Sequence, residues 1–261
     1  MATMAFCSNI LVTGANRGIG LELIKQLAVK MGGEAHIYAC CREPEGPGAE
    51  ALREVATKCP GKITIIKLDV ADEDSMSTAA RTVSEKIAAG GLNLLINNAA
   101  INKPASPAPL SATTKKDMMD VYETNVVGPH DANILVSLCV PGNKMSCRRA
   151  AIINLSTMVS SIEKCPETFS TAQMYPYRTS KAALNMLTRC QALDFKNHNI
   201  LVAAIHPGWV RTEMGGMRNT VGGLVGGCSL SQRQGTPWSG RQSVTGLHIQ
   251  TNSHTGVHNY G

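Results

Sequence analysis

The chain has 261 residues, of which 43% are hydrophobic and 17% are charged, and its formal net charge is +6. This apolar content supports a sizeable core, which excludes a disordered or collagen-like chain. Aromatic residues make up only 4% and the basic residues are scattered, so a nucleic-acid-binding surface is not expected. The length is typical of one α/β domain.

The nine cysteines are odd in number and none has C-x-x-C spacing, which favours reduced thiols over a disulfide framework. A signal peptide begins with a basic segment that is followed by an apolar one. Here the first charged residue is Arg17, so no basic segment precedes the apolar residues Ile10, Leu11 and Val12, and a signal peptide is not expected. No apolar run approaches the ~20 residues that cross a bilayer. The sequence therefore predicts a cytoplasmic protein that does not enter a membrane.

Six short apolar segments alternate with longer amphipathic ones. Because these segments are apolar almost throughout, they predict strands that are covered on both faces. Apolar residues at helical spacing, which form one stripe along each predicted helix, follow the first and the third of these segments. The alternation predicts an α/β fold with a single doubly wound parallel sheet, Rossmann-like, with helices on both faces. The predicted strands are 9–13, 36–41, 63–68, 92–97, 151–155 and 200–205, and the stripes are Leu23, Ile24, Leu27, Ala28, Met31 and Met76, Ala79, Ala80, Val83, Ile87.

Two regions depart from this alternation. Residues 103–110 contain three prolines and predict a loop after the fourth strand. Residues 216–261 hold 10 of the 24 glycines and no Ala, Lys, Asp or Glu. That composition predicts a largely irregular segment, with one short strand at 247–251.

A glycine-rich turn joins the first predicted strand to an amphipathic helix. Gly14 permits a tight turn, Gly18 lets backbone N–H groups approach a pyrophosphate, and Gly20 lets helix and strand pack closely. The positive end of the helix dipole then faces the phosphates. An ordinary tight turn is the simpler alternative. The predicted cofactor-binding residues of this turn are Gly14, Asn16, Arg17, Gly18, Ile19 and Gly20.

The end of the second strand bears on the choice between NAD and NADP. An NAD site places an acid there to bind the ribose 2′-hydroxyl. Here Arg42 offers a planar guanidinium to a 2′-phosphate, and Arg17 adds a second positive charge. NADP(H) is the predicted cofactor. The alternative is that Arg42 pairs with Glu43 or solvent, and Glu43 approaches the ribose.

Tyr177 and Lys181 begin a helical pattern in which their i, i+4 spacing places both on one face. A phenol with a pKa near ~10 exchanges protons poorly at neutral pH unless its anion is stabilised. An ammonium one turn away supplies such a field. Alone, the pair is more often a solvated tyrosine and a surface lysine, but beside the glycine turn it is the best acid/base candidate.

Several motifs in this order resemble the short-chain dehydrogenase/reductase family, and within it the C-factor/sniffer-type carbonyl reductases. The resemblance runs from residue 9 to about residue 215. It is carried by Thr13–Gly20, Leu68-Asp69-Val70, Asn97-Asn98-Ala99-Ala100, Thr124-Asn125-Val126, Asn154-Leu155-Ser156-Thr157, Tyr177–Lys181 and His206-Pro207-Gly208-Trp209-Val210-Arg211-Thr212.

The resemblance implies a role for each matching position. Tyr177 would protonate the carbonyl oxygen as hydride arrives, and Lys181 would lower its pKa and hold the nicotinamide ribose. Asn125 would position a water that links Lys181 to solvent. A helix N-cap is the alternative for Asp69, and a satisfied core amide is the alternative for Asn125. The remaining cofactor contacts implied are Asp69 and Val70 at the adenine, Asn98, Ala99 and Ala100 at the ribose, and Pro207, Gly208, Val210 and Thr212 at the nicotinamide.

The chain departs from the family pattern at three places. Thr157 stands where the family has its substrate-polarising serine; it keeps the hydroxyl, with Ser156 as the alternative donor. Ala100 replaces a glycine, which is acceptable if φ is negative there. The segment 216–261 matches the family's C-terminal helices poorly, so we treat 1–215 as the dinucleotide-binding and catalytic domain and 216–261 as a divergent segment.

The predicted function is NADPH-dependent reduction of a small aldehyde or ketone. A cofactor-binding regulatory or scaffold protein with little turnover is the main alternative, and NAD-dependent alcohol oxidation is a third. His254 and His258 have metal-ligand spacing only in a helix, which their neighbours disfavour, so no metal is predicted. A homodimer is expected only by analogy with similar folds, and the sequence leaves the oligomeric state undecided.

Overall fold

The computed structural model describes residues 9–31, 35–87, 91–105, 107–139, 150–208, 210, 212 and 214, and the backbone of 248–250. The strands are β1 (Asn9–Thr13), β2 (His36–Cys41), β3 (Ile63–Lys67), β4 (Leu94–Asn97), β5 (Ala151–Leu155), β6 (Leu201–His206) and β7 (His248–Gln250). The α-helices are α1 (Gly18–Lys30), α2 (Glu50–Lys58), α3 (Glu73–Lys86), α4 (Lys115–Tyr122), α5 (Gly128–Asp131), α6 (Cys165–Thr168) and α7 (Tyr175–Asp194).

Shorter helical turns connect these elements. A π-helix, η3 (Glu123–Val127), joins α4 to α5. The 3₁₀ turns are η1 (Pro47–Ala49), η2 (Leu110–Ala112), η4 (Ala132–Leu138), η5 (Met158–Ser160) and η6 (Phe195–His198).

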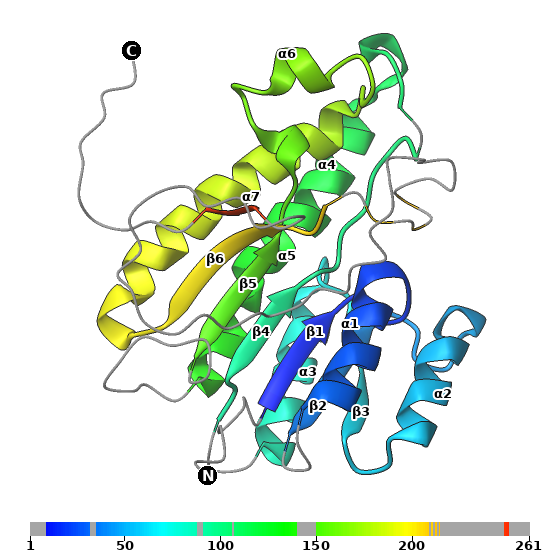
Figure 1. The fold of residues 1–261 in the computed structure, drawn as a ribbon, viewed down its shortest axis with the longest axis vertical. Coiled ribbons are helices and arrows are strands. Elements are labelled where there is room, and N and C mark those ends of the chain that lie inside the picture. Colours follow the sequence, from blue (N-terminus) through cyan, green and yellow to red (C-terminus); the bar gives the residue numbers. More distant parts are fainter. Residues whose placement is uncertain are drawn as a thin grey trace.

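The strands form one sheet in the order β3-β2-β1-β4-β5-β6-β7. The first six are parallel, and β7 pairs antiparallel with β6 at the edge (Figure 1). Between β3 and β4 the chain crosses from one side of β1 to the other, so the sheet has a topological switch point between β1 and β4. The predicted fold class is confirmed, and β7 confirms the short strand expected at 247–251.

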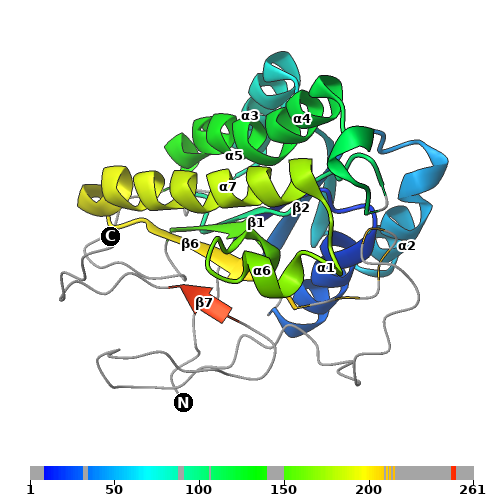
Figure 2. The ribbon, with the colours of Figure 1, turned by 90° about the horizontal axis from the view of Figure 1, so that it is seen from above.

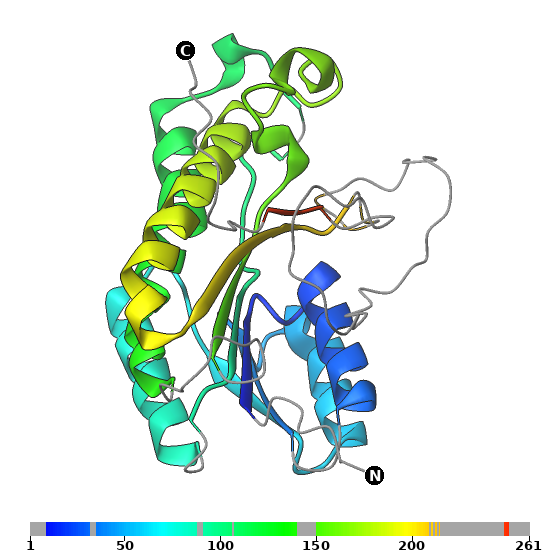
Figure 3. The ribbon, with the colours of Figure 1, turned by 60° about the vertical axis from the view of Figure 1, so that its left-hand side comes forward.

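Helices lie on both sides of the sheet. In Figure 2, α3, α4, α5 and α7 cover one face, while α1 and α2 cover the other. Figure 3 shows the same layers from the side, with α1 and α2 beside β1, β2 and β3. No helix in the described part of the chain is long and apolar enough to cross a lipid bilayer.

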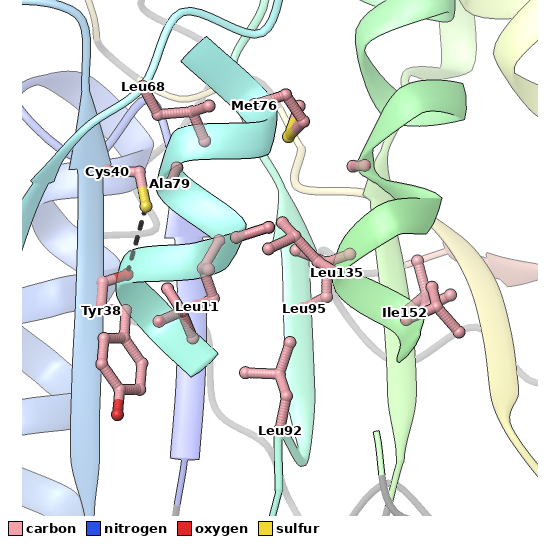
Figure 4. Packing of buried hydrophobic residues seen from close by; sticks show 14 of the residues in the cluster. Leu11, Tyr38, Cys40, Leu68, Met76, Ala79, Leu92, Leu95, Leu135 and Ile152 are labelled. Atoms are coloured by element: carbon pink, nitrogen blue, oxygen red, sulfur yellow. Dashed lines mark hydrogen bonds between the residues drawn. The ribbon is translucent and has the colours of Figure 1, made fainter. Parts of the chain in front are cut away.

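The core consists of two hydrophobic clusters, one on each face of the sheet. Successive residues of a strand alternate between them, because side chains in a pleated strand point to opposite faces. Leu11 pairs in register with Tyr38 and Leu95, and all three join the cluster under α3 (Figure 4). Their neighbours Ile10 and Val12 join the cluster under α1.

The predicted elements agree closely with the observed ones. Met76, Ala79, Ala80 and Val83 are the buried residues of α3, which confirms its apolar stripe. In the proline-containing segment, the described residues 103–105 and 107–109 form no strand or α-helix, and η2 begins at residue 110. The division of the chain at residue 215 stays a prediction, because β7 is the only described part of the second segment.

Candidate active site

The glycine turn lies between β1 and α1, at the carboxyl edge of the sheet beside the switch point. Gly14 and Gly18 adopt φ values of +63° and +54°, which favour glycine. A Cβ on Gly20 would lie 2.1 Å from the carbonyl oxygen of Gly14, so only glycine lets the helix approach this closely. The turn therefore has the backbone shape that a pyrophosphate-binding turn requires.

Asn98, directly after β4, fastens this turn. Its side-chain Nδ2 donates to the carbonyl oxygens of Thr13 at 2.8 Å and Gly14 at 2.9 Å. The backbone N–H groups of Asn98 and Ala99 both donate to Thr13 Oγ1 at 3.0 Å. The amide of Asn98 thus holds the turn, while Ala99 and Ala100 are half-buried. Asn199 is the single non-glycine residue with positive φ in the described chain, so Ala100 causes no strain there.

The two arginines predicted to select the cofactor are both exposed. Arg17 is the N-cap residue of α1, and Arg42 directly follows β2. No ion pair joins Arg42 to Glu43 in the described part of the chain, so the pairing with Glu43 that was the alternative to phosphate binding is not observed. Asn16 donates to the carbonyl of Gly48 at 3.0 Å and attaches the turn to η1. Ile19 is half-buried in the first turn of α1.

Asp69 and Val70 follow β3 at the same edge of the sheet. Asp69 Oδ1 accepts from the backbone N–H of Ala71 at 3.1 Å. The helix N-cap is Asp72, whose side chain accepts from Ser75, so the N-cap interpretation of Asp69 is wrong. Val70 is 8% exposed and belongs to the core cluster under α3, so its side chain faces the interior.

The segment after β6 reaches the glycine turn. Gly208 has a φ of +82°, which turns the chain after Pro207. A Cβ on Gly18 would lie 3.4 Å from Cγ2 of Thr212, so Thr212 lies next to the glycine turn. Its contact with the nicotinamide stays a prediction. Val210 is 38% exposed. Trp209, Arg211, His254 and His258 lie outside the described residues.

Tyr177 and Lys181 lie in the first two turns of α7, where Pro176 occupies one of the first two positions of the helix. Lys181 Nζ is 5.7 Å from the centroid of the Tyr177 ring, which brings the predicted pair together. Lys181 is 2% exposed, and its Nζ donates to the carbonyl of Leu155 at 2.7 Å. The tyrosine is half-buried.

Burial controls the ionisation of both groups. It raises the pKa of Tyr177 to about 12 and lowers the pKa of Lys181 to about 7. The expected lowering of the Tyr177 pKa by Lys181 is therefore not seen, because burial of the phenol disfavours its charged form. The protein residues by themselves keep Tyr177 as a neutral phenol, which is the form that donates a proton.

Asn125 lies at the centre of the π-helix η3 and is fully buried. Its Oδ1 accepts from the N–H of Ile101 at 2.9 Å, and its Nδ2 donates to the carbonyl of Ile101 and to Ser180 Oγ, each at 3.0 Å. The side chain is thus a satisfied core amide. It joins α7, between Tyr177 and Lys181, to the loop after β4. A water held by Asn125 stays a proposal.

Ser156 and Thr157 follow β5 and point to different partners. Ser156 is 7% exposed, and its hydroxyl donates to Asn185 Oδ1 at 2.6 Å. Thr157 is half-buried and is the N-cap residue of η5, where its hydroxyl oxygen accepts from the N–H of Val159 at 3.4 Å. The Ser156 hydroxyl is already used inside the protein, whereas the proton of the Thr157 hydroxyl remains available for a ligand.

Two polar residues that shape this region were not predicted from the sequence. Arg178 is 7% exposed and donates to carbonyl or hydroxyl oxygens of Cys165, Thr168 and Ala172. Asn185 bonds to residues on both sides of Thr157. The available signal was the spacing of Tyr177, Lys181 and Asn185 at i, i+4 and i+8, which places polar groups on one stripe of an otherwise amphipathic helix.

Comparison with known proteins agrees with this geometry. The family model described as short chain dehydrogenase matches residues 8–221. A short-chain dehydrogenase, anuI, from Penicillium roqueforti is 30% identical over 210 residues, which are 79% of this chain and 80% of that protein. Gluconate 5-dehydrogenase from Gluconobacter oxydans is 30% identical over 207 residues, which are 78% of this chain and 72% of that dehydrogenase.

Two solved structures are similar over most of the chain. The NADPH-bound carbonyl reductase from chicken fatty liver is 41% identical with a TM-score of 0.76, covering 81% of this chain and 83% of its own. The carbonyl reductase Sniffer of D. melanogaster is 33% identical with a TM-score of 0.71, and the match covers 80% of this chain and 84% of the Sniffer chain. The chain therefore belongs to the short-chain dehydrogenase family and is an oxidoreductase that uses a nicotinamide dinucleotide.

Proposed function

We propose that this protein reduces the carbonyl group of small aldehydes or ketones with NADPH. The observation that carries the proposal is the pair formed by Tyr177 and Lys181, whose helix is linked to the glycine turn through hydrogen bonds of Asn125 and Asn98 and the short backbone segment between Asn98 and Ile101. Asn125 connects Ser180 of α7 to Ile101, and three residues before Ile101 the amide of Asn98 binds Gly14. The proton donor and the dinucleotide-binding turn thus belong to one connected framework.

The residues present fit a dinucleotide. The close approach of Gly20 to Gly14 leaves the N-terminal end of α1 free of side-chain bulk, as a pyrophosphate requires. Arg17 and Arg42 are exposed at the ends of elements that border this turn, where a 2′-phosphate would find two positive charges. The similarity to an NADPH-bound carbonyl reductase agrees with this choice. When bound, the reduced nicotinamide supplies the hydride.

In this proposal the chain's own residues handle the oxygen atom of the substrate. Thr157 Oγ1 donates a hydrogen bond to the carbonyl oxygen and orients it. Tyr177 transfers its phenolic proton to the same oxygen as the carbon is reduced, so that an alcohol forms. The raised pKa of Tyr177 keeps that proton in place until negative charge develops on the oxygen. Lys181 then stabilises the phenolate that proton transfer leaves.

The proposal is tested with the purified full-length protein, NADPH and a panel of reactive aldehydes and ketones. We expect loss of the NADPH absorbance band at a rate that Tyr177→Phe reduces by at least about a hundredfold, the low end of general acid catalysis. Tyr175→Phe is the matched control, because Tyr175 starts the same helix two residues earlier.

Each alternative function has its own outcome in this experiment. Binding of NADPH without turnover of any substrate would contradict the proposal and favour a regulatory or scaffold protein. Tighter binding of NAD than of NADP, together with oxidation of alcohols, would favour the dehydrogenase direction.

A further inference from the structure

The residues that flank Thr157 are held by one side chain of α7. Asn185 Oδ1 accepts the hydroxyl proton of Ser156 at 2.6 Å, and Asn185 Nδ2 donates to Ser160 Oγ at 2.8 Å. The Ser160 hydroxyl then donates to the carbonyl oxygen of Thr157, which also accepts from the backbone N–H of Ser160 at 3.3 Å. A single amide therefore fixes the residue before Thr157 and, through Ser160, the backbone of Thr157 itself.

The donors and acceptors of these hydrogen bonds follow one direction along the chain of side chains. Ser156 donates, so the oxygen of Asn185 accepts and its nitrogen must face Ser160. Ser160 accepts from that nitrogen and donates its own proton to Thr157. Ser156 and Ser160 are 7% and 6% exposed, so water competes poorly for these bonds. With the Asn185 amide turned over, Ser160 would donate to Oδ1 in place of the Thr157 carbonyl, and the Ser156 proton would lose its acceptor, so the observed orientation keeps more of these bonds.

The same face of α7 supports the whole turn after β5. Lys181 binds the carbonyl of Leu155, and Asn185, one helical turn further on, binds the residues on both sides of Thr157. The turn is thereby aligned with the helix that carries Tyr177. Hydroxyl placement at a reacting oxygen is sensitive to shifts of about 1 Å, which can reduce a rate by roughly a hundredfold.

We propose that Asn185 is a positioning residue for carbonyl reduction, because its amide fixes the turn from Ser156 to Ser160 and thereby holds the Thr157 hydroxyl at the substrate oxygen beside Tyr177. The inference rests on the proposed function, since it assigns Asn185 to the site where Thr157 and Tyr177 act. It also explains why Ser156, although adjacent, is not the hydroxyl that meets the substrate.

The experiment measures kcat, and the dissociation constant of NADPH, with para-nitrobenzaldehyde as the probe substrate. Asn185→Leu and Ser160→Ala are made in the wild-type chain and again together with Thr157→Ala. Ser161→Ala is the matched control for Ser160→Ala, because among the described residues the Ser161 hydroxyl accepts from the N–H of Lys164 and takes no part in this chain of bonds. NADPH affinity within about twofold of wild type shows that a variant is folded.

We expect Asn185→Leu to lower kcat by about ten- to a hundredfold in the wild-type chain. In the Thr157→Ala chain it should cause no further loss, because the hydroxyl that it positions is gone. Ser160→Ala should repeat both results with a smaller loss, and it keeps the inference testable if Asn185→Leu does not fold. A residue that merely stabilises the fold would give losses that multiply in the double variant.

Several results would overturn the inference while leaving the proposed function intact. These are an unchanged kcat for Asn185→Leu, losses that multiply with Thr157→Ala, or full activity of Thr157→Ala in a protein whose turnover still requires Tyr177. Absence of turnover in the wild-type protein would instead overturn the proposed function, and the inference with it.

Discussion

The ammonium group of Lys181 donates a 2.7 Å hydrogen bond to the carbonyl of Leu155, the last residue of β5. This bond joins the middle of the sheet to the helix that carries Tyr177. Parallel strands and helices in such folds meet at the carboxyl edge of the sheet, where ligands bind. In this protein the edge is therefore fixed by polar bonds from α7 as well as by apolar packing below it.

The buried Lys181 makes stability depend on pH. Burial lowers its pKa from the ordinary 10.5 to about 7 in the folded chain. Between these two values the unfolded chain binds more protons than the folded chain, so folding stability rises with pH across that window. We expect wild type to gain stability relative to Lys181→Met as the pH rises from about 7 to 10.5, in urea titrations. Lys25→Met, at an exposed position of α1, is the control. A stability difference that stays constant with pH would contradict the prediction.

Gly20→Ala should remove cofactor binding. The added methyl group would lie 2.1 Å from the Gly14 carbonyl oxygen and 2.6 Å from Asn98 Nδ2, so the turn must move. Overpacking of this kind costs about 1–3 kcal/mol, and we expect NADPH affinity to fall at least about tenfold in calorimetric titrations. Gly48→Ala is the matched control, because its methyl group would meet only Asn16 Nδ2, at 3.8 Å. Equal NADPH affinities of Gly20→Ala and Gly48→Ala would contradict the prediction that cofactor binding requires glycine at position 20.

Arg42→Ala should change cofactor preference. A guanidinium that binds a 2′-phosphate contributes about 1.5–3 kcal/mol through charge-assisted hydrogen bonds. We expect NADPH binding to weaken by about ten- to a hundredfold while NADH binding stays the same, as measured by thermal shift with each cofactor. Arg81→Ala, an exposed arginine of α3, controls for the loss of one positive charge. Equal weakening of both cofactors would show that Arg42 does not read the phosphate.

Arg178→Met should lower stability. The guanidinium donates to Thr168 Oγ1 at 2.7 Å and the Ala172 carbonyl at 3.1 Å, and lies 5.8 Å from the centroid of the Phe169 ring. Removing it takes away the donor to the Thr168 hydroxyl oxygen and leaves the Ala172 carbonyl oxygen with the N–H of Met174 alone, at a cost of about 1–3 kcal/mol. We expect the urea midpoint to fall accordingly, while Arg189→Met on the same helix changes it little. A midpoint equal to that of wild type would mean that water replaces Arg178.

The sequence by itself determined the strands, the glycine turn and the placement of Tyr177 and Lys181 on one face of a helix. Each is encoded by neighbouring residues: continuous apolar segments give buried strands, and Gly20 must be glycine wherever a helix begins this close to a strand. The spacing of Tyr177 and Lys181 fixes their common face in the same way, because four residues make about one helical turn. Such patterns need no knowledge of distant segments.

Only the tertiary structure decided the roles of polar residues whose partners are far away in the sequence. Asn185 lies 29 positions after Ser156, and their hydrogen bond shows that the hydroxyl proton of Ser156 is used inside the protein. Asn125 and Ile101 are 24 positions apart, and their bonds make Asn125 a core amide. The direction of a side chain at the end of a strand depends on these distant partners, because hydroxyl and amide groups turn toward whichever buried donor or acceptor the fold brings within reach.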